Sequence, residues 1–382
     1  MLLTILAGFD RTTVQPVVIC PEPGPLRKMI IDLGVTVESS PVLDARFTWR
    51  PDHALRYLRS FARVIVQLRQ QVIHLDPDVI HANSVRAGLV VTMATIGSRK
   101  RIIWHIHDVL PRHPFNPLIR VVALASRRTR IIAVAQAGAD RFIGSFLPLK
   151  QRVTVIPNGI DVARFRPDAT ARRKIHGELK LSEGERVIGM VGRLSPKKGQ
   201  LELLRVFPEV LRKCPNTTLV IAGSPAFNRE AEYAQLLEHT TKELGISDRI
   251  RMLGERDDVA AIMQSLDLLV VNSATEACSL VILEAMASGT PVLATKTGGT
   301  PEIIEHKKCG WLVPARDENA LASAIIKLVG EPDLRAHLAE NGRQRIASRF
   351  SISRCTSELQ NYYFHGAARF SAATTEIQPA QI

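Results

Sequence analysis

Two glutamates with seven residues between them are a candidate site for binding a polar ligand. Glu276 precedes an apolar segment that predicts a helix from about Ser279 to Gly289, and Glu284 lies inside that segment. The first turn of a helix presents backbone N–H groups that bind anions such as phosphate. Carboxylates on either side of a bound phosphate could accept hydrogen bonds from sugar and ribose hydroxyls. Alternatively, both glutamates lie on an ordinary solvent-exposed helix surface. Against this, the surrounding residues are apolar, so Glu284 would be buried, which is unusual for a carboxylate without a partner.

A pair of cations forms a second candidate. Arg193 and Lys198 lie in the segment GRLSPKKG, from Gly192 to Gly199, which follows a predicted strand and precedes an amphipathic helix pattern. Ligands of open α/β sheets bind at the carboxyl ends of the strands, where glycine permits close approach to the backbone. A guanidinium and an ammonium group at that position suit a diphosphate. Judged from this turn alone, the two residues could instead be cations on a solvated surface loop with no ligand.

A third strand end carries the Gly-rich loop KTGGTPE, residues 296–302. With the loops that carry Arg193 and Glu276, it places glycines or acidic residues at three strand ends, which we expect to meet at one edge of a sheet.

The elements that must position these residues are short apolar strands alternating with longer amphipathic helices, which is typical of an α/β fold with parallel sheets. The sequence predicts twelve strands, at residues 16–20, 36–40, 78–82, 101–108, 130–135, 152–158, 186–192, 217–223, 249–254, 266–273, 290–295 and 309–315. We expect two sheets of this kind joined near residues 160–175, with the proline-containing segment 157–170 as a linker. The expected domains are 1–165, 166–350 and a returning helix in 351–382 that ends in a frayed tail.

Charge divides the chain unevenly. Residues 1–170 contain 23 Lys and Arg against 12 Asp and Glu, so they hold +11 of the net charge of +13. This excess predicts either an anionic partner, such as a phospholipid surface or an acidic glycan, or simply a well-solvated surface. Nucleic acid is not expected, because the cations are not interleaved with aromatic residues. The apolar start has no features of a signal peptide, so we expect a cytoplasmic protein.

One basic segment could contact a membrane directly. The stretch 47–72 places three arginines among apolar residues at helical spacing: Arg56, Arg59 and Arg63 beside Leu55, Leu58, Ala62 and Val66. Such a helix could bind peripherally to the anionic inner face of the cell membrane. Alternatively, it covers the first sheet with its arginines in solvent, which we favour slightly.

Neither a disulfide framework nor a metal site is expected. The five cysteines are scattered and form no CxxC pair. The pair Asp76 and Asp78 precedes its strand and predicts a turn rather than a metal site. No G-x-G-x-x-G follows a first strand, which argues against a Rossmann dehydrogenase.

Together these motifs resemble family 4 of the retaining glycosyltransferases, which have the GT-B fold of two Rossmann-like domains facing each other across a cleft. The resemblance rests on GRLSPKKG, on Glu276 and Glu284, and on EAMASGTPVLAT, GGTPEII and GWLVP. PDVIHANS, WHIHD and VIPNGID in the first half match as well. It implies metal-independent transfer of a hexose from a nucleotide-diphosphate sugar to a glycan or lipid-linked acceptor, with no cofactor.

The resemblance also implies a role for each matching residue. Arg193 and Lys198 would neutralise the donor diphosphate, Glu276 would lie near the reacting sugar, and Glu284 would bind the ribose. His107 would face the sugar from the first domain, whereas without the resemblance it would be an ordinary histidine at a strand end.

Other positions complete the predicted site. The further substrate-binding positions are Gly192, Gly254 beside the nucleobase, and Ser279, Leu280 and Val281 at the helix start. His105 is expected on the opposite side of its strand from His107.

Two departures from the family pattern affect these expectations. Relatives begin with a strand and a Gly-rich loop, whereas this sequence starts in what resembles the following helix. Either the start codon is placed too late or the protein is truncated, and in the second case the alternative function is a truncated, non-catalytic nucleotide-binding remnant. Cys278 and Ser279 replace a common aromatic–glycine pair, which leaves the donor preference open; Cys278 is expected to fill space.

Overall fold

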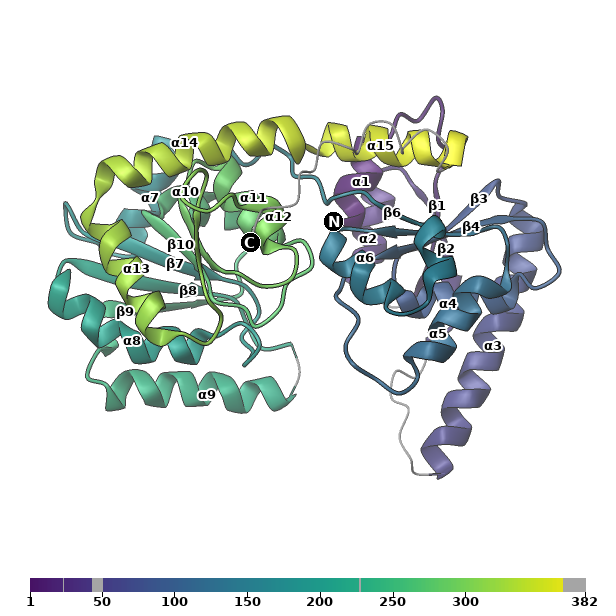
Figure 1. Cartoon of the computed structure of the whole chain (residues 1–382), viewed down its shortest axis with the longest axis horizontal. Coiled ribbons are helices and arrows are strands. Elements are labelled where there is room, and N and C mark those ends of the chain that lie inside the picture. The colour runs from purple at the N-terminus through teal and green to yellow at the C-terminus, as the bar shows by residue number, and fades with distance from the viewer. Residues whose placement is uncertain (23, 43–50, 227, 367–382) are drawn as a thin grey trace. The chain divides into compact units, whose positions relative to one another are not determined.

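The computed structural model describes residues 1–22, 24–42, 51–226 and 228–366. It divides the chain into two compact units (Figure 1). The first comprises Met1–Pro157 and Ser353–Ile382, and the second comprises Asn158–Ile352. Among the described residues, no helix has the length and apolar composition needed to cross a bilayer.

The second unit is built on a six-stranded parallel sheet in the order β12-β11-β10-β7-β8-β9. Its strands are β7 (Arg186–Val191), β8 (Thr217–Ala222), β9 (Ile250–Gly254), β10 (Leu268–Val271), β11 (Val292–Thr295) and β12 (Trp311–Val313). Its helices are α7 (Ala169–Glu178), α8 (Gln200–Lys213), α9 (Asn228–Glu243), α10 (Val259–Ser265), α11 (Leu280–Ala287), α12 (Thr300–Ile303), α13 (Glu318–Gly330) and α14 (Pro332–Arg349), with a short 3-10 turn at Ser247–Arg249.

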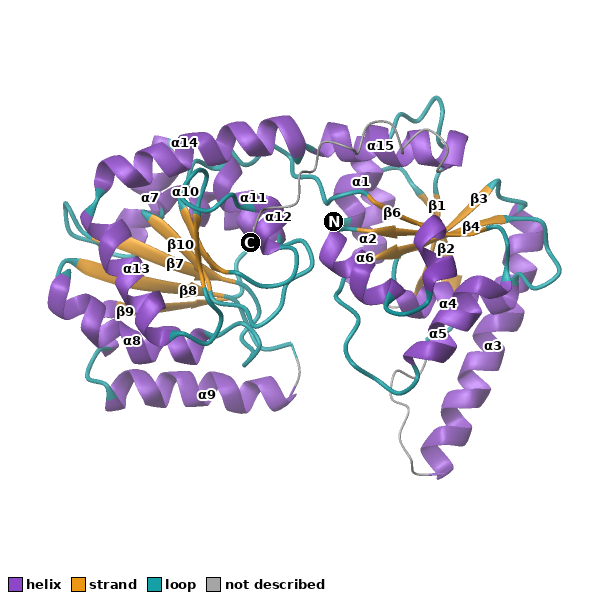
Figure 2. Ribbon diagram, in the orientation of Figure 1, coloured by secondary structure: helices purple, strands orange, loops and turns teal. Residues whose placement is uncertain are grey.

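Helices cover both faces of this sheet, as Figure 2 shows. Successive side chains of a strand point to opposite faces, so Ile188 packs in the cluster with α8, α9 and α13. Its neighbour Val187 packs in the other cluster, with α7, α10, α11 and α14. Both faces are apolar, which explains the continuous apolar runs in the sequence. The sheet is therefore a buried platform whose strand ends carry the candidate loops.

The first unit contains two separate parallel sheets among its described residues. One pairs β1 (Val17–Pro21) with β2 (Thr36–Ser40). The other has the order β3-β4-β5-β6, from β3 (Val79–Ala82), β4 (Arg101–Ile106), β5 (Thr129–Ala133) and β6 (Val153–Val155). Its helices are α1 (Leu2–Gly8), α2 (Pro25–Asp32), α3 (Pro51–Leu75), α4 (Val85–Ala94), α5 (Asn116–Ala125), α6 (Gln136–Ile143) and α15 (Ile352–His365), with a 3-10 turn at Leu147–Arg152.

Helix α15 is tied to the first unit by side-chain hydrogen bonds. The Arg101 guanidinium donates to the backbone oxygens of Tyr362 and Tyr363. The Tyr363 hydroxyl lies 2.5 Å from Nδ1 of His81. The expected tail beyond residue 366 lies outside the described residues.

The expected linker at 157–170 differs from the structure. Ile160 and Phe165 are buried in the second-unit core, and Ile160 exchanges backbone hydrogen bonds with Phe350 and Ile352. The boundary between the units lies at Pro157–Asn158. Proline and turn residues suggested an exposed connection, but the apolar side chains between them pack against the second unit.

Candidate active site

Three loops of the second unit meet at the carboxyl ends of its strands. The loop after β7 joins the loop after β10, since the Ala274 N–H donates to the Lys197 carbonyl at 2.8 Å. The loop after β10 joins the loop after β11, since the Gly299 N–H donates to the Glu276 carbonyl at 2.9 Å. The sequence prediction that these loops share one sheet edge is confirmed.

Lys198 and Glu276 form an ion pair within this group of loops. Lys198 Nζ lies 2.6 Å from Glu276 Oε1, and the Glu276 side chain is only 12% exposed. A largely buried carboxylate costs free energy unless a cation or hydrogen bonds compensate it. The pair thus holds an ammonium and a carboxylate side by side at the ends of β7 and β10.

Arg193 lies on the same loop as Lys198 and has a different acidic neighbour. Its Nε lies 3.4 Å from Oε1 of Glu230, in the first turn of α9. The loop itself is braced by Gln200, which is 1% exposed and donates from Nε2 to the Arg193 carbonyl at 3.0 Å. Neither Glu230 nor Gln200 was predicted, because nothing in their local sequence marks them as partners of the loop.

Helix α11 begins where the sequence predicted, with Ser279 as its N-cap and Leu280 as its first residue. The Ser279 side chain makes no capping hydrogen bond in the described structure and is 5% exposed. The N–H groups of Leu280 and Val281 therefore lie in a first turn that the cap side chain does not satisfy. Asn158 donates to the Cys278 carbonyl at 3.2 Å, which fixes the residue before the cap.

Glu284 lies inside α11, as predicted, and is mostly buried. Burial raises the pKa of its carboxyl group to about 7, while the nearby Arg164 lowers it. At neutral pH the group is therefore divided between its acid and its carboxylate forms. Both forms can accept a hydrogen bond from a hydroxyl, and the acid form can also donate one.

Glycines allow the loops to approach one another. Gly298 has φ +50°, and a Cβ there would lie 1.9 Å from the Glu276 carbonyl oxygen. Gly223 has φ +146°, and a Cβ there would lie 2.0 Å from the carbonyl oxygen of Gly192. The Gly223 N–H also donates to the Gly254 carbonyl at 2.7 Å, which links Gly254 to the same strand ends.

His107 lies in the first unit, just after β4, and its imidazole has a defined partner. Nε2 lies 2.7 Å from the amide oxygen of Asn83. The His105 ring lies beside it, with a centroid distance of 4.1 Å and the two ring planes tilted by 37°. The prediction that His105 faces the opposite side is therefore wrong, because residues two apart in an extended chain point to the same side.

The two histidines next to His107, His81 and His105, have neutral imidazoles. Nε2 of His81 lies 3.1 Å from Nδ1 of His105. Burial lowers the pKa of His81 to about 4, with a smaller contribution from His107. Burial also lowers the pKa of His105 well below its usual range, with smaller contributions from His81 and His107.

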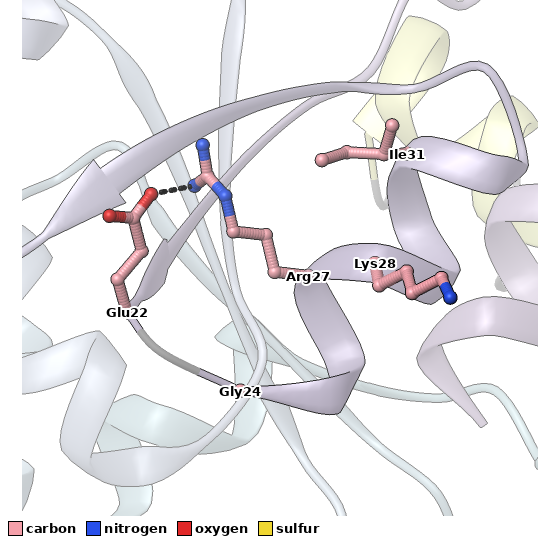
Figure 3. Close-up of a pocket in the computed structure, with 5 residues that line it drawn as sticks. All are labelled: Glu22, Gly24, Arg27, Lys28 and Ile31. Carbon is pink, nitrogen blue, oxygen red and sulfur yellow. Dashed lines mark ion pairs between the residues drawn. The ribbon is translucent and has the colours of Figure 1, made fainter.

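A hollow elsewhere in the first unit contains none of the predicted site residues. It has a volume of about 340 Å³ and is lined by Glu22, Gly24, Arg27, Lys28 and Ile31. Figure 3 shows the Arg27 guanidinium turned toward Glu22, with which it pairs at 2.8 Å. Across the described ranges, no cluster of three or more His, Cys, Asp or Glu side chains is arranged to hold a metal ion.

Comparison with known proteins gives a consistent result for both halves. Residues 1–164 match the model of Glycosyltransferase Family 4, and residues 171–345 match the model of Glycosyl transferases group 1. The D-inositol 3-phosphate glycosyltransferase of Corynebacterium jeikeium is 38% identical over 218 residues, 55% of this chain and 51% of that protein. The chain thus spans about half the length of this relative.

Two longer alignments agree with it. The GDP-mannose-dependent alpha-(1-6)-phosphatidylinositol monomannoside mannosyltransferase of Mycobacterium tuberculosis is 28% identical, covering 78% of this chain and 79% of that protein. The crystal structure of Anabaena Alr3699/HepE in complex with UDP-glucose superposes with a TM-score of 0.79 at 27% identity, covering 94% of this chain and 93% of that one. The two units fit the two Rossmann-like domains of the GT-B fold, and the chain belongs to the family 4 glycosyltransferases.

Proposed function

We propose that this chain is a retaining, metal-independent hexosyltransferase that uses a nucleotide-diphosphate sugar. The observation that carries the proposal is the ion pair between Lys198 and the largely buried Glu276. Lys198 lies on the same loop as Arg193. Arg193, Lys198 and the first turn of α11 would hold the diphosphate, because all three present positive charge or N–H donors. As the glycosidic bond breaks, they would stabilise the charge that develops on the leaving phosphate.

The carboxylates would hold the sugar and the ribose. Glu276 would accept hydrogen bonds from sugar hydroxyls beside the diphosphate, and Glu284 would bind the ribose hydroxyls. We assign His107 to the sugar on the basis of the family resemblance. Support for a nucleotide sugar comes from HepE, whose crystal structure contains UDP-glucose.

The acceptor class we propose is a glycan or lipid-linked molecule in the assembly of cell-surface polysaccharide or glycolipid. The names of the relatives include inositol phosphate and a phosphatidylinositol mannoside, so polar and lipid acceptors both occur among proteins similar to this one.

Glu276→Gln tests the assignment of the reacting centre. We expect this variant to lose transfer from its nucleotide sugar by at least about 100-fold, because a charge next to the reacting sugar is removed. The exposed Glu183→Gln is the matched control and should retain activity. Transfer would be followed as release of nucleoside diphosphate and as glycosylated product, whose anomeric configuration tests retention. Full activity in Glu276→Gln would refute the assignment.

We also propose peripheral contact between α3 and an anionic membrane. Leu55, Leu58 and Val66 are 49%, 58% and 56% exposed, so these apolar residues do not cover the sheet. Arg59 and Arg63 lie on the adjoining stripe of the helix, also exposed. Exposed leucines beside arginines suit the surface of an anionic bilayer.

Vesicle sedimentation tests the membrane proposal. The wild-type chain should bind phosphatidylglycerol vesicles more strongly than phosphatidylcholine vesicles, and replacing Arg59 and Arg63 by glutamate should abolish the difference. The same change at Arg212 and Lys213, exposed cations of α8, is the control. Equal binding by both double variants would contradict a role for α3.

A further inference from the structure

The two cations assigned to the diphosphate are both paired with carboxylates of the protein. Lys198 pairs with Glu276 at 2.6 Å, and Arg193 pairs with Glu230 at 3.4 Å. Glu276 belongs to the proposed reacting centre, whereas Glu230 comes from α9 and has no part in the proposed chemistry. Its position beside the arginine assigned to the diphosphate therefore indicates a role other than in the reaction.

The Glu230 carboxylate is held in place from its own side. Its side chain is only 13% exposed, and Oε2 accepts a hydrogen bond from the Ala226 N–H at 2.8 Å. As an acidic residue in the first turn of α9, it is also stabilised by the helix dipole. The carboxylate is thus fixed whether or not Arg193 is beside it.

Arg193 is the more exposed member of this pair. The Arg193 side chain is 44% exposed, and its closest approach to Glu230 is longer than the contact between Lys198 and Glu276. A part-exposed ion pair at this distance contributes little net stability. A diphosphate carries more charge than a carboxylate and accepts several charge-assisted hydrogen bonds, so it can take the guanidinium from Glu230.

We propose that Glu230 is a displaceable counter-ion of Arg193. It accompanies the guanidinium while the site is empty, gives it up to the diphosphate of the donor, and takes it back when the nucleoside diphosphate leaves. This inference rests on the proposed function. Glu230 consequently weakens nucleoside-diphosphate binding, both by competing for Arg193 and by repelling the phosphates, and it favours release of that product after transfer.

Binding of nucleoside diphosphates to the full chain tests the inference. UDP, GDP and dTDP would each be titrated by calorimetry against wild type, Glu230→Gln and Glu232→Gln. Glutamine at position 230 keeps the shape and an oxygen for the Ala226 N–H but removes the negative charge. Glu232 lies on the same helix and is exposed, so Glu232→Gln makes the same change in net charge away from Arg193.

We expect Glu230→Gln to bind the preferred nucleoside diphosphate roughly three- to tenfold more tightly than wild type, the range that Coulomb repulsion gives at a part-exposed site. Glu232→Gln should match wild type. The gain should shrink in high salt, because ions that enter this part-exposed site screen the repulsion between the carboxylate and the phosphates.

The outcomes separate the inference from the function on which it rests. Unchanged or weaker binding by Glu230→Gln, with wild type binding normally, would overturn the counter-ion role and leave the proposed function standing. An equal gain in Glu232→Gln would overturn it too, because the effect would then reflect net charge alone. If wild type bound none of the three nucleotides, the proposed function and this inference would both fail. Circular dichroism and thermal unfolding of each variant would verify that it is folded.

Discussion

At the scale of single residues, Glu284 is a carboxyl group whose surroundings oppose its ionisation. It is mostly buried in α11, and its pKa of about 7 follows from that burial. In the unfolded chain the pKa of the same group would be close to its ordinary value of 4.5. Between these two values the folded protein holds a proton that the unfolded chain has released.

The free energy of unfolding should therefore fall as the pH rises through this window. The contribution of protonated Glu284 is fully present below about pH 4.5 and is lost by about pH 7, an effect on the order of 3 kcal/mol at most. Glu284→Gln removes the titration, so its unfolding free energy should depend less on pH than that of wild type. Urea denaturation of both proteins at pH 5 and pH 8 measures how much the unfolding free energy of each changes with pH. An equal change in wild type and in Glu284→Gln would show that Glu284 is not buried as described.

Some of the site was accessible from residue types alone. The positions of Glu276, Glu284, Arg193 and Lys198 relative to their strands and helix follow from spacing, and the structure has them where the sequence predicted. Glu230 was not predictable, because its contact with Arg193 depends on how α9 follows β8 in space. The error at His105 was one of strand geometry, since side chains two residues apart share a side.

At the scale of elements, the loops after β10 and β11 depend on a glycine. Gly298 adopts positive φ, and any side chain there would collide with the Glu276 carbonyl oxygen. Unlike the flexible end of a side chain, a backbone oxygen cannot move aside without moving its loop. The position of Glu276 is therefore set partly by a residue on the neighbouring strand end.

Gly298→Ala should displace the Glu276 loop and strongly reduce transfer while the fold survives. Gly184→Ala is the matched control, because Gly184 also has positive φ, at 77°, but a Cβ there would meet nothing within 4 Å. Both variants should incur a similar backbone penalty of about 1 kcal/mol, visible in thermal unfolding. Activity should fall only in Gly298→Ala; equal loss in both would mean that strain, rather than the collision, is responsible.

Strands were predicted more completely than their pairing. Every strand in the described ranges overlaps one of the segments read from apolar patterning. The division of the first unit into a two-stranded and a four-stranded sheet was not predicted. Patterning reports how deeply a segment is buried, whereas pairing depends on contacts between segments far apart in the chain.

At the scale of the whole molecule, two units have separate cores and separate chemical roles in the proposal. The second unit carries the residues assigned to the diphosphate, the ribose and the sugar. The first unit carries His107 and the basic helix α3. Because Arg193, Lys198, Glu276 and Glu284 all belong to Asn158–Ile352, donor binding can be tested on one unit's residues within the intact chain.

In the proposed function, the strand ends of the second unit bind a nucleoside diphosphate through Arg193 and Lys198. Calorimetric titration of UDP, GDP and dTDP against wild type, Lys198→Ala and Lys197→Ala tests it most directly. Lys197 is adjacent to Lys198 and exposed, so Lys197→Ala removes one positive charge from the same loop as Lys198→Ala does. We predict that Lys198→Ala weakens binding of the preferred nucleotide about tenfold or more, as expected for a charge-assisted contact, while Lys197→Ala changes it little. Equal binding by wild type and Lys198→Ala would contradict the account.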